Sequence, residues 1–211
     1  MAQIMSLADD EERVRSSLAR AFQSAHTNFL LGSGASVPAI PVAGAVEQEI
    51  ATLFAEGNGE AANRRLAAFL RSVQEPTNAL IQGDARAANE ETLTNYVNLL
   101  RVLDTMLSER RTRLLPTQTT IFTTNYDLFL EAASSRHVGV ILNDGFSRGP
   151  ALDGRADYSS SSFFTTVYNV GHVYQYRVEV PCINLIKLHG SLSWLKTAEV
   201  VTCSFTARSV P

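Results

Sequence analysis

The sequence predicts an α/β fold in which a parallel sheet has helices on both faces and carries a helical insertion. Short apolar segments recur along the chain, and each is followed by glycine or small polar residues, as strands are when they end in a turn. Segments with apolar residues at helical spacing separate them. The block of about residues 57–116 has the helical pattern almost throughout, which indicates the insertion.

The first half of the chain is predicted to be mainly helical. A strand is expected at residues 29–31, and helices over residues 4–27, 42–54, 60–73 and 89–113, the last being the longest. Glu75-Pro76 is expected to end the third of these helices, because proline has no N–H for a helix interior. The block 57–116 carries little polar chemistry, and we interpret it as a packed insertion or an oligomer face.

The second half alternates strands and helices in the order that builds a parallel, Rossmann-like sheet. Residues 147–162 are rich in glycine, aspartate and serine and are expected to form a loop. Strands are predicted at 118–123, 138–142, 182–188 and 200–206, a helix at 127–135, and a hairpin from 163–167 and 173–180.

Composition limits the classes of function. A length of 211 residues suits one domain, and a net charge of −3 argues against a broad nucleic-acid-binding face. The chain has two cysteines, Cys182 and Cys203, which lie far apart in the sequence. A four-cysteine zinc site within the chain is therefore excluded, and buried thiols in a reducing cytoplasm are expected. No apolar segment approaches the roughly 20 residues of a membrane span and no signal peptide is recognisable, so we expect a cytoplasmic protein.

The segment Gly32-Ser33-Gly34-Ala35-Ser36 follows the first predicted strand. Glycine has no Cβ, so a phosphate can approach its backbone closely, and the N–H groups of the turn can face an anion. The dinucleotide fingerprint asks for a third glycine where this chain has Val37, and glycine pairs also occur in ordinary turns.

Two further polar motifs follow predicted strands, Thr123-Thr124-Asn125-Tyr126-Asp127 and Lys187-Leu188-His189-Gly190-Ser191. Ligands of open α/β sheets bind at this carboxyl edge. Asn125 suits a ribose hydroxyl and a water, and Asp127 suits an amide or hydroxyl donor, although both residue types also cap helices. A histidine followed by glycine suits a general base at a turn, although a lone histidine is more often structural.

Together the three motifs resemble, in order and spacing, the hallmark motifs of the sirtuin superfamily, which are Gly-Ala-Gly-x-Ser, Thr-Gln-Asn-Ile-Asp and His-Gly. The Thr-Asn-Tyr-Asp form and Asp144-Gly145-Phe146 look closest to bacterial sirtuin-like proteins of antiviral defence, which are NAD hydrolases. The resemblance runs from about residue 28 to residue 195, and the helical insertion carries none of it.

The resemblance implies an NAD hydrolase that cleaves the nicotinamide–ribose bond to give nicotinamide and ADP-ribose. Asn125 would position the reactive water and the ribose, and His189 would act on a ribose hydroxyl; these are the implied catalytic residues. Asp127 would bind the nicotinamide amide, and the glycine loop would contact the phosphates of NAD. The implied NAD-binding residues are Gly32, Ser33, Gly34, Ser36, Thr124, Asp127 and Gly190.

The chain also departs from the sirtuin pattern. The zinc-ribbon cysteines of deacylating sirtuins are absent, so no zinc is expected and deacylation is disfavoured. The Asp-Phe-Arg segment is not recognisable in residues 37–44, and Thr124 replaces glutamine. No further Gly-Thr or Gly-Ser segment, as expected for the adenosine half, follows the His189 motif before residue 211. Residues 1–211 are therefore expected to be one catalytic domain that is either part of a longer protein or has an incomplete pocket.

Relatives in antiviral defence act as oligomers, some with a hexameric helicase-type ATPase, so the resemblance implies a homo-oligomer with such a partner. The alternatives are a non-catalytic sensor of NAD or ADP-ribose and, with less support, a deacylase or ADP-ribosyltransferase. The presence of both Asn125 and His189 favours catalysis, because a sensor needs neither. The sequence does not separate hydrolysis from cyclisation or transfer.

Overall fold

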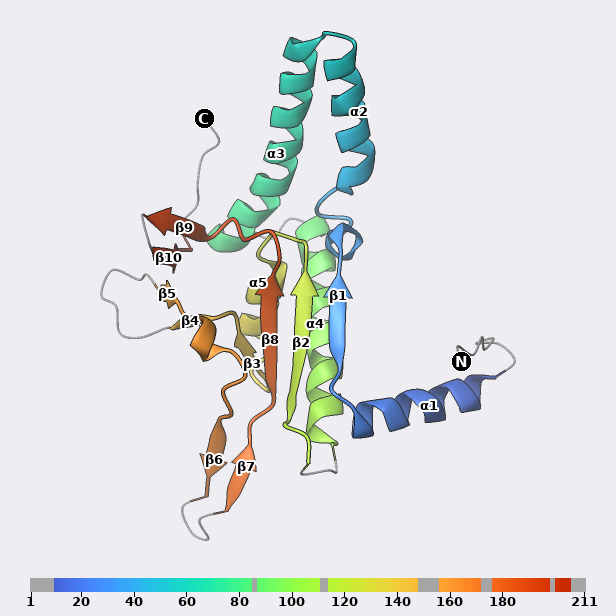
Figure 1. The fold of residues 1–211 in the computed structure, drawn as a ribbon, viewed down its shortest axis with the longest axis vertical. Coiled ribbons are helices and arrows are strands. Elements are labelled where there is room, and N and C mark those ends of the chain that lie inside the picture. The colour runs from blue at the N-terminus through green and yellow to red at the C-terminus, as the bar shows by residue number, and fades with distance from the viewer. Residues whose placement is uncertain are drawn as a thin grey trace.

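A four-stranded parallel sheet forms the centre of the computed structural model, which describes residues 10–84, 87–110, 114–147, 156–171, 176–197 and 200–205. Its strands lie in the order β1-β2-β8-β3 (Figure 1). They are β1 (Asn28–Leu31), β2 (Gln118–Thr123), β8 (Cys182–Lys187) and β3 (Ile141–Asn143). The predicted α/β class with a parallel sheet is confirmed, and the strands predicted at 29–31, 118–123 and 182–188 lie within one residue of the observed ones.

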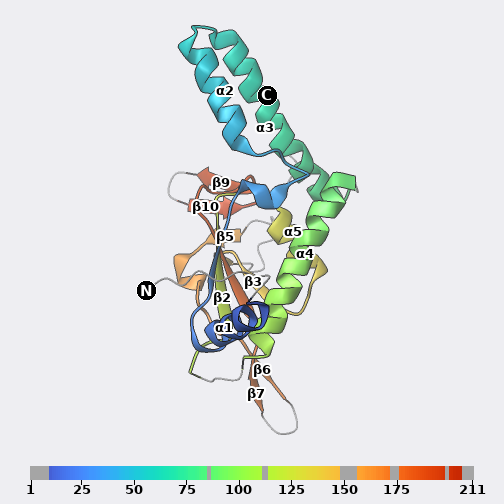
Figure 2. The same ribbon diagram turned by 90° about the vertical axis from the view of Figure 1, so that its right-hand side faces the viewer.

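Helices α4 (Ala87–Ser108) and α5 (Phe129–Arg136) pack on one side of this sheet (Figure 2). Ile121, Ile183 and Leu185 of the strands are buried against them. We expected helices on both faces, but no α-helix of the described residues covers the other face, where Leu30 is 73% exposed. A doubly wound sheet has its first strand in the middle, whereas β1 lies at the edge of the described sheet, so the Rossmann-like assignment stays a prediction.

Helices α2 (Ala43–Ala55) and α3 (Gly59–Gln82) form a pair that projects beyond the carboxyl ends of the strands (Figure 1). The prediction that a helix ends at Glu75-Pro76 was wrong, because α3 continues to Gln82. With 24 residues it is also longer than α4, which has 22. Pro76 cannot donate within the helix, but it is buried and its carbonyl accepts from Asn89 Nδ2 at 3.1 Å. Tertiary packing therefore outweighs the local preference of proline.

The helical block predicted at 57–116 divides into two parts with different surroundings. The first part of helix α3 packs with α2 and projects from the body of the molecule, whereas Phe69 and Val73 of the same helix are buried in the core. Helix α4 belongs to the core, because Leu93, Leu100 and Leu103 are buried beneath the sheet. A layer that supports the sheet therefore comes from the segment that the sequence marked as an insertion.

A second, antiparallel sheet of order β4-β5-β10-β9 was not predicted. Its strands are β4 (Phe146–Ser147), β5 (Ala156–Tyr158), β10 (Val200–Cys203) and β9 (Trp194–Thr197). Strand β5 and the 3-10 turn Ser160–Ser162 lie where a loop was expected, and residues 148–155 of that loop lie outside the described residues. Phe146 packs edge-on against Tyr158 and Trp194 at 5.4 Å between ring centroids, so tertiary aromatic contacts hold these short strands together.

The predicted hairpin is present as β6 (Tyr168–Val170) and β7 (Arg177–Glu179), but its first strand is not at 163–167. That segment instead reaches the sheet, where the Phe164 N–H donates to Asn184 Oδ1 at 3.2 Å. Strand β3 begins three residues later than the strand predicted at 138–142, since Val138 is exposed.

The outer boundaries also differ from the predictions. Helix α1 (Glu11–Ser24) is shorter than the helix predicted over 4–27, whose first residues lie outside the described ones. Helix α5 starts two residues after the predicted helix, and α4 ends before 113, with residues 111–113 not described. Strand β10 ends at Cys203, and residue 206 is likewise not described. In the described part of the chain, no helix is long and apolar enough to cross a membrane.

Candidate active site

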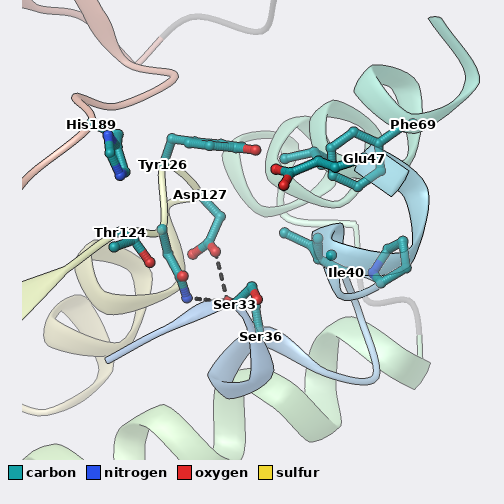
Figure 3. A pocket seen from close by; sticks show the side chains of 13 residues that line it. Ser33, Ser36, Ile40, Glu47, Phe69, Thr124, Tyr126, Asp127 and His189 are labelled. Atoms are coloured by element: carbon teal, nitrogen blue, oxygen red, sulfur yellow. Dashed lines mark hydrogen bonds between the residues drawn. The ribbon is translucent and has the colours of Figure 1, made fainter. Parts of the chain in front are cut away.

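A pocket of about 300 Å³ opens at the carboxyl edge of the parallel sheet. The polar segments that follow β1, β2 and β8 reach it, together with α2 and α3 (Figure 3). Parallel strands bring their carboxyl ends to one edge, so segments far apart in the chain meet there. The lining residues are Ser33, Ser36, Ile40, Pro41, Gly44, Glu47, Phe69, Val73, Thr124, Asn125, Tyr126, Asp127 and His189.

The glycine segment after β1 forms a 3-10 turn, Ser33–Ser36, in place of a simple loop. Neither Gly32 nor Gly34 has positive φ, and no atom lies within 4 Å of where a Cβ would stand on either of them. Gly32 and Gly34 therefore leave open space beside the backbone, but neither adopts a backbone conformation that only glycine favours. Within the described residues, the N–H groups of Ser33 and Gly34 donate no hydrogen bond.

Ser36 stands at the centre of a buried hydrogen-bond network. Its hydroxyl donates to Asp127 Oδ2 at 2.6 Å, which leaves its oxygen to accept. The amide of Asn125 donates to Ser36 Oγ and to the Gly32 carbonyl, each at 3.0 Å. The hydroxyl of Tyr96 lies 3.1 Å from Ser36 Oγ and supplies the remaining hydrogen bond. Residues from three separate segments are thus locked in one geometry before any ligand binds.

Tyr96 is the part of this network that the sequence analysis missed. It lies on α4, in the block expected to carry little polar chemistry, and its ring stacks on Phe129 at 5.9 Å between centroids. Burial and then the negative charge of Asp127 raise the pKa of Tyr96 to about 12. The tyrosine is consequently a neutral hydroxyl at physiological pH. No motif marked it, because its role depends on where α4 packs.

Asp127 combines the two functions that the sequence left open. Its Oδ1 accepts from the Phe129 N–H at 3.1 Å, so it satisfies the first N–H of α5 from the position before the N-cap residue Leu128. Its Oδ2 accepts from Ser36, and the residue also lines the pocket. Each carboxylate oxygen has a second lone-pair direction, so Asp127 can still accept from a ligand.

His189 lies across the pocket from Glu47 and Phe69 (Figure 3). It is exposed and makes no hydrogen bond with a described residue, so both ring nitrogens are available to a ligand. Gly190 follows with φ of +80°, a conformation that favours glycine and turns the chain away from the pocket directly after the histidine. The Leu188 N–H donates to the Thr123 carbonyl at 2.9 Å and ties this turn to the end of β2.

Behind the pocket, Lys187 joins the second and third motifs. Its ammonium group pairs with Glu131 Oε1 at 2.7 Å and donates to the Asp127 carbonyl and, at 3.1 Å, to Ser191 Oγ. The two charged side chains are only 2% and 8% exposed. Burial raises the pKa of Glu131, and the lysine opposes that shift. This pair holds the Asp127 segment against the turn that carries His189.

Most of the predicted site residues meet at one place. Ser33, Ser36, Thr124, Asn125, Asp127 and His189 all line the pocket. Gly32, Gly34 and Gly190 do not line it, although the Gly32 carbonyl holds Asn125. The opposite wall, with Glu47, Phe69 and Tyr126, was not predicted as part of the site.

The pocket can bind a small polar ligand and carry out acid–base chemistry on it. Asn125 offers its carbonyl oxygen, which accepts no hydrogen bond from a described residue, and His189 offers a proton acceptor. Nowhere in the described ranges does a group of three histidine, cysteine or carboxylate side chains form a metal site. Both cysteines are buried, as expected, and burial and then Glu179 raise the pKa of Cys182 to about 11.

Comparison of the chain with protein-family models and with curated proteins found no match.

Proposed function

We propose that this chain is an NAD hydrolase that releases nicotinamide and ADP-ribose. The observation that carries the proposal is the meeting of Ser36, Asn125, Asp127 and His189 around one pocket at the carboxyl edge of the sheet. These are the positions at which the sequence resembles sirtuins, and they come from three segments up to about 150 residues apart. The Rossmann-like assignment and NAD as the substrate belong to this proposal.

The proposed roles follow from which polar atoms are free. The Oδ1 of Asn125 orients a water or a ribose hydroxyl, because its Nδ2 is already held by Gly32 and Ser36. Asp127 accepts from the nicotinamide amide, and His189 accepts a proton from a ribose hydroxyl or the attacking water. The phosphates run past the N–H groups of Ser33 and Gly34, which donate no hydrogen bond within the described residues. The pocket, at about 300 Å³, is at the small end of ligand sites and suits the nicotinamide riboside end of the dinucleotide.

The biological setting is proposed from the sequence resemblance alone. The protein depletes NAD in bacterial antiviral defence, acts in the cytoplasm as a homo-oligomer, and has a hexameric helicase-type ATPase as its partner. The projecting α2–α3 pair offers surface for such contacts.

The test is to incubate the purified chain with NAD, with and without its genomic neighbour, and to follow nicotinamide and ADP-ribose by chromatography. His189→Ala is the decisive variant, because this exposed side chain makes no hydrogen bond with a described residue and its loss should leave the fold unchanged. A general acid or base typically raises the reaction rate by a factor of about 100 to 10,000, so the turnover of His189→Ala should be lower than that of the wild type by such a factor. His26→Ala, another exposed histidine far from the pocket, is the matched control and should keep full activity.

Asn125→Ala should also abolish turnover, with circular dichroism used to check folding because Asn125 is buried. Turnover by His189→Ala at the wild-type rate would refute the assigned mechanism. Binding of NAD or ADP-ribose without any turnover, in the chain alone and with its neighbour, would identify a sensor instead.

A further inference from the structure

Glu47 is a carboxylate on the pocket wall that the network around Asp127 does not use. It projects from α2 beside Tyr126 and Phe69 (Figure 3). It makes no hydrogen bond or ion pair with a described residue, whereas Glu49, two positions further along α2, pairs with Arg65 at 2.7 Å. Because α2 presents Glu47 to the pocket without a partner, its charge is available to a ligand.

The charges around the pocket are mainly negative. Asp127 lines it together with Glu47, and the described lining residues include no lysine or arginine. After burial, the charge of Glu47 is the largest cause that raises the pKa of Tyr126, so the carboxylate acts on the groups around it. Two aromatic rings, Tyr126 and Phe69, complete this wall.

Carboxylates next to aromatic rings attract organic cations, through charge and through the ring faces. A phosphate group would be repelled at the same place. We propose that Glu47 binds the positively charged nicotinamide ring of the substrate. This inference rests on the proposed function and adds the residue that recognises the positive charge and the orientation of the substrate, with its cationic end against Glu47.

The position of Glu47 also determines whether its removal changes KM or kcat. When the bond between the ribose C1′ and the ring nitrogen breaks, its electron pair goes to nicotinamide, which leaves neutral. The positive charge moves to the adjacent ribose, and water adds to C1′ and gives up one proton. The charge stays near Glu47 throughout, so the carboxylate stabilises the bound substrate and the transition state to a similar extent. Removing it should raise KM more than it lowers kcat.

The experiment compares wild type with Glu47→Gln and with Glu49→Gln as the matched control. NMR titrations measure the affinity for the 1-methylnicotinamide cation and for neutral nicotinamide, which differ by the methyl group and the charge. Wild type and Glu49→Gln should prefer the cation. In Glu47→Gln the ratio of the affinity for the cation to the affinity for neutral nicotinamide should fall about tenfold, which corresponds to the loss of one weak charge interaction. The KM for NAD should rise by a similar factor.

NAD turnover is measured on the same preparations, so that the two proposals can fail separately. An unchanged preference in Glu47→Gln, or no cation binding by wild type, would overturn the assignment of Glu47 even if NAD is hydrolysed. A preference that depends on Glu47 without any NAD turnover, in the chain alone and with its neighbour, would support the cation site and refute the hydrolase. Urea denaturation of Glu47→Gln confirms that the exposed substitution leaves the fold intact.

Discussion

Replacing Lys187 by methionine removes the positive partner of a buried carboxylate. Lys187 is 2% exposed and Glu131 8%, and Glu131 Oε2 already lacks a hydrogen-bond partner among the described atoms. Breaking a buried pair from one side costs about 3–5 kcal/mol, because the remaining charge is left unpaired. The Asp127 carbonyl also loses its hydrogen bond from the lysine, which adds about 1 kcal/mol. We expect Lys187→Met to destabilise the fold by about 5 kcal/mol at pH 8.

The loss should depend on pH with a definite sign. The pKa of Glu131 is raised by burial, and the lysine is what opposes this shift, so the variant raises that pKa further. A carboxyl whose folded pKa exceeds its unfolded value stabilises the fold below the unfolded pKa, and this stability is lost as pH rises through the folded pKa. Lys187→Met should therefore regain stability from pH 8 to pH 5, by up to about 1.4 kcal/mol per pH unit.

Urea denaturation followed by circular dichroism at pH 5 and pH 8 measures these free energies of unfolding. The double variant Lys187→Met with Glu131→Leu removes both charges, so it should be only about 1–2 kcal/mol less stable than wild type, with little dependence on pH. Arg64→Met breaks the exposed pair with Glu60 and should change stability by less than about 1 kcal/mol. If the single variant is as stable as the double variant at pH 8, the buried charge is not isolated and the reasoning is wrong.

Three further experiments test the fold around the site. Gly145→Ala should lower the free energy of unfolding by about 3 kcal/mol, because φ is +81° and the new Cβ would stand 2.7 Å from an aromatic ring. Gly57→Ala has a similar φ of +75° but open space around the new Cβ, so it should lower that free energy by only about 1 kcal/mol. Equal losses in urea denaturation would contradict this. Ser36→Ala should destabilise the fold by about 2–3 kcal/mol and Tyr96→Phe by about 1 kcal/mol, because only the serine donates to a carboxylate. Thermal unfolding should therefore show a larger fall in Tm for Ser36→Ala than for Tyr96→Phe. Cys182, with its pKa raised to about 11, should react with a disulfide reagent at pH 8 far more slowly than free cysteine, and rapid labelling of the folded protein would show that the thiol is accessible.

The sequence by itself determined the three strands that carry the polar motifs, β1, β2 and β8. Strands β1 and β8 are mainly apolar, and β2 is rich in the β-forming residues threonine, isoleucine and phenylalanine. Each is followed by turn-forming residues, and these are local properties. The same reasoning placed Ser36, Asn125 and His189 at one edge, because parallel strands align their carboxyl ends.

Only the tertiary structure decided which other side chains complete the site. Tyr96 and Glu47 lie on helices whose sequence patterns give the apolar face but not the neighbour it packs against. Pro76 stays within α3, and the short strands of the second sheet form, because burial and aromatic contacts outweigh weak local preferences. Periodicity reports the environment of one segment, whereas a pocket wall depends on the packing of several segments, which the local pattern does not encode.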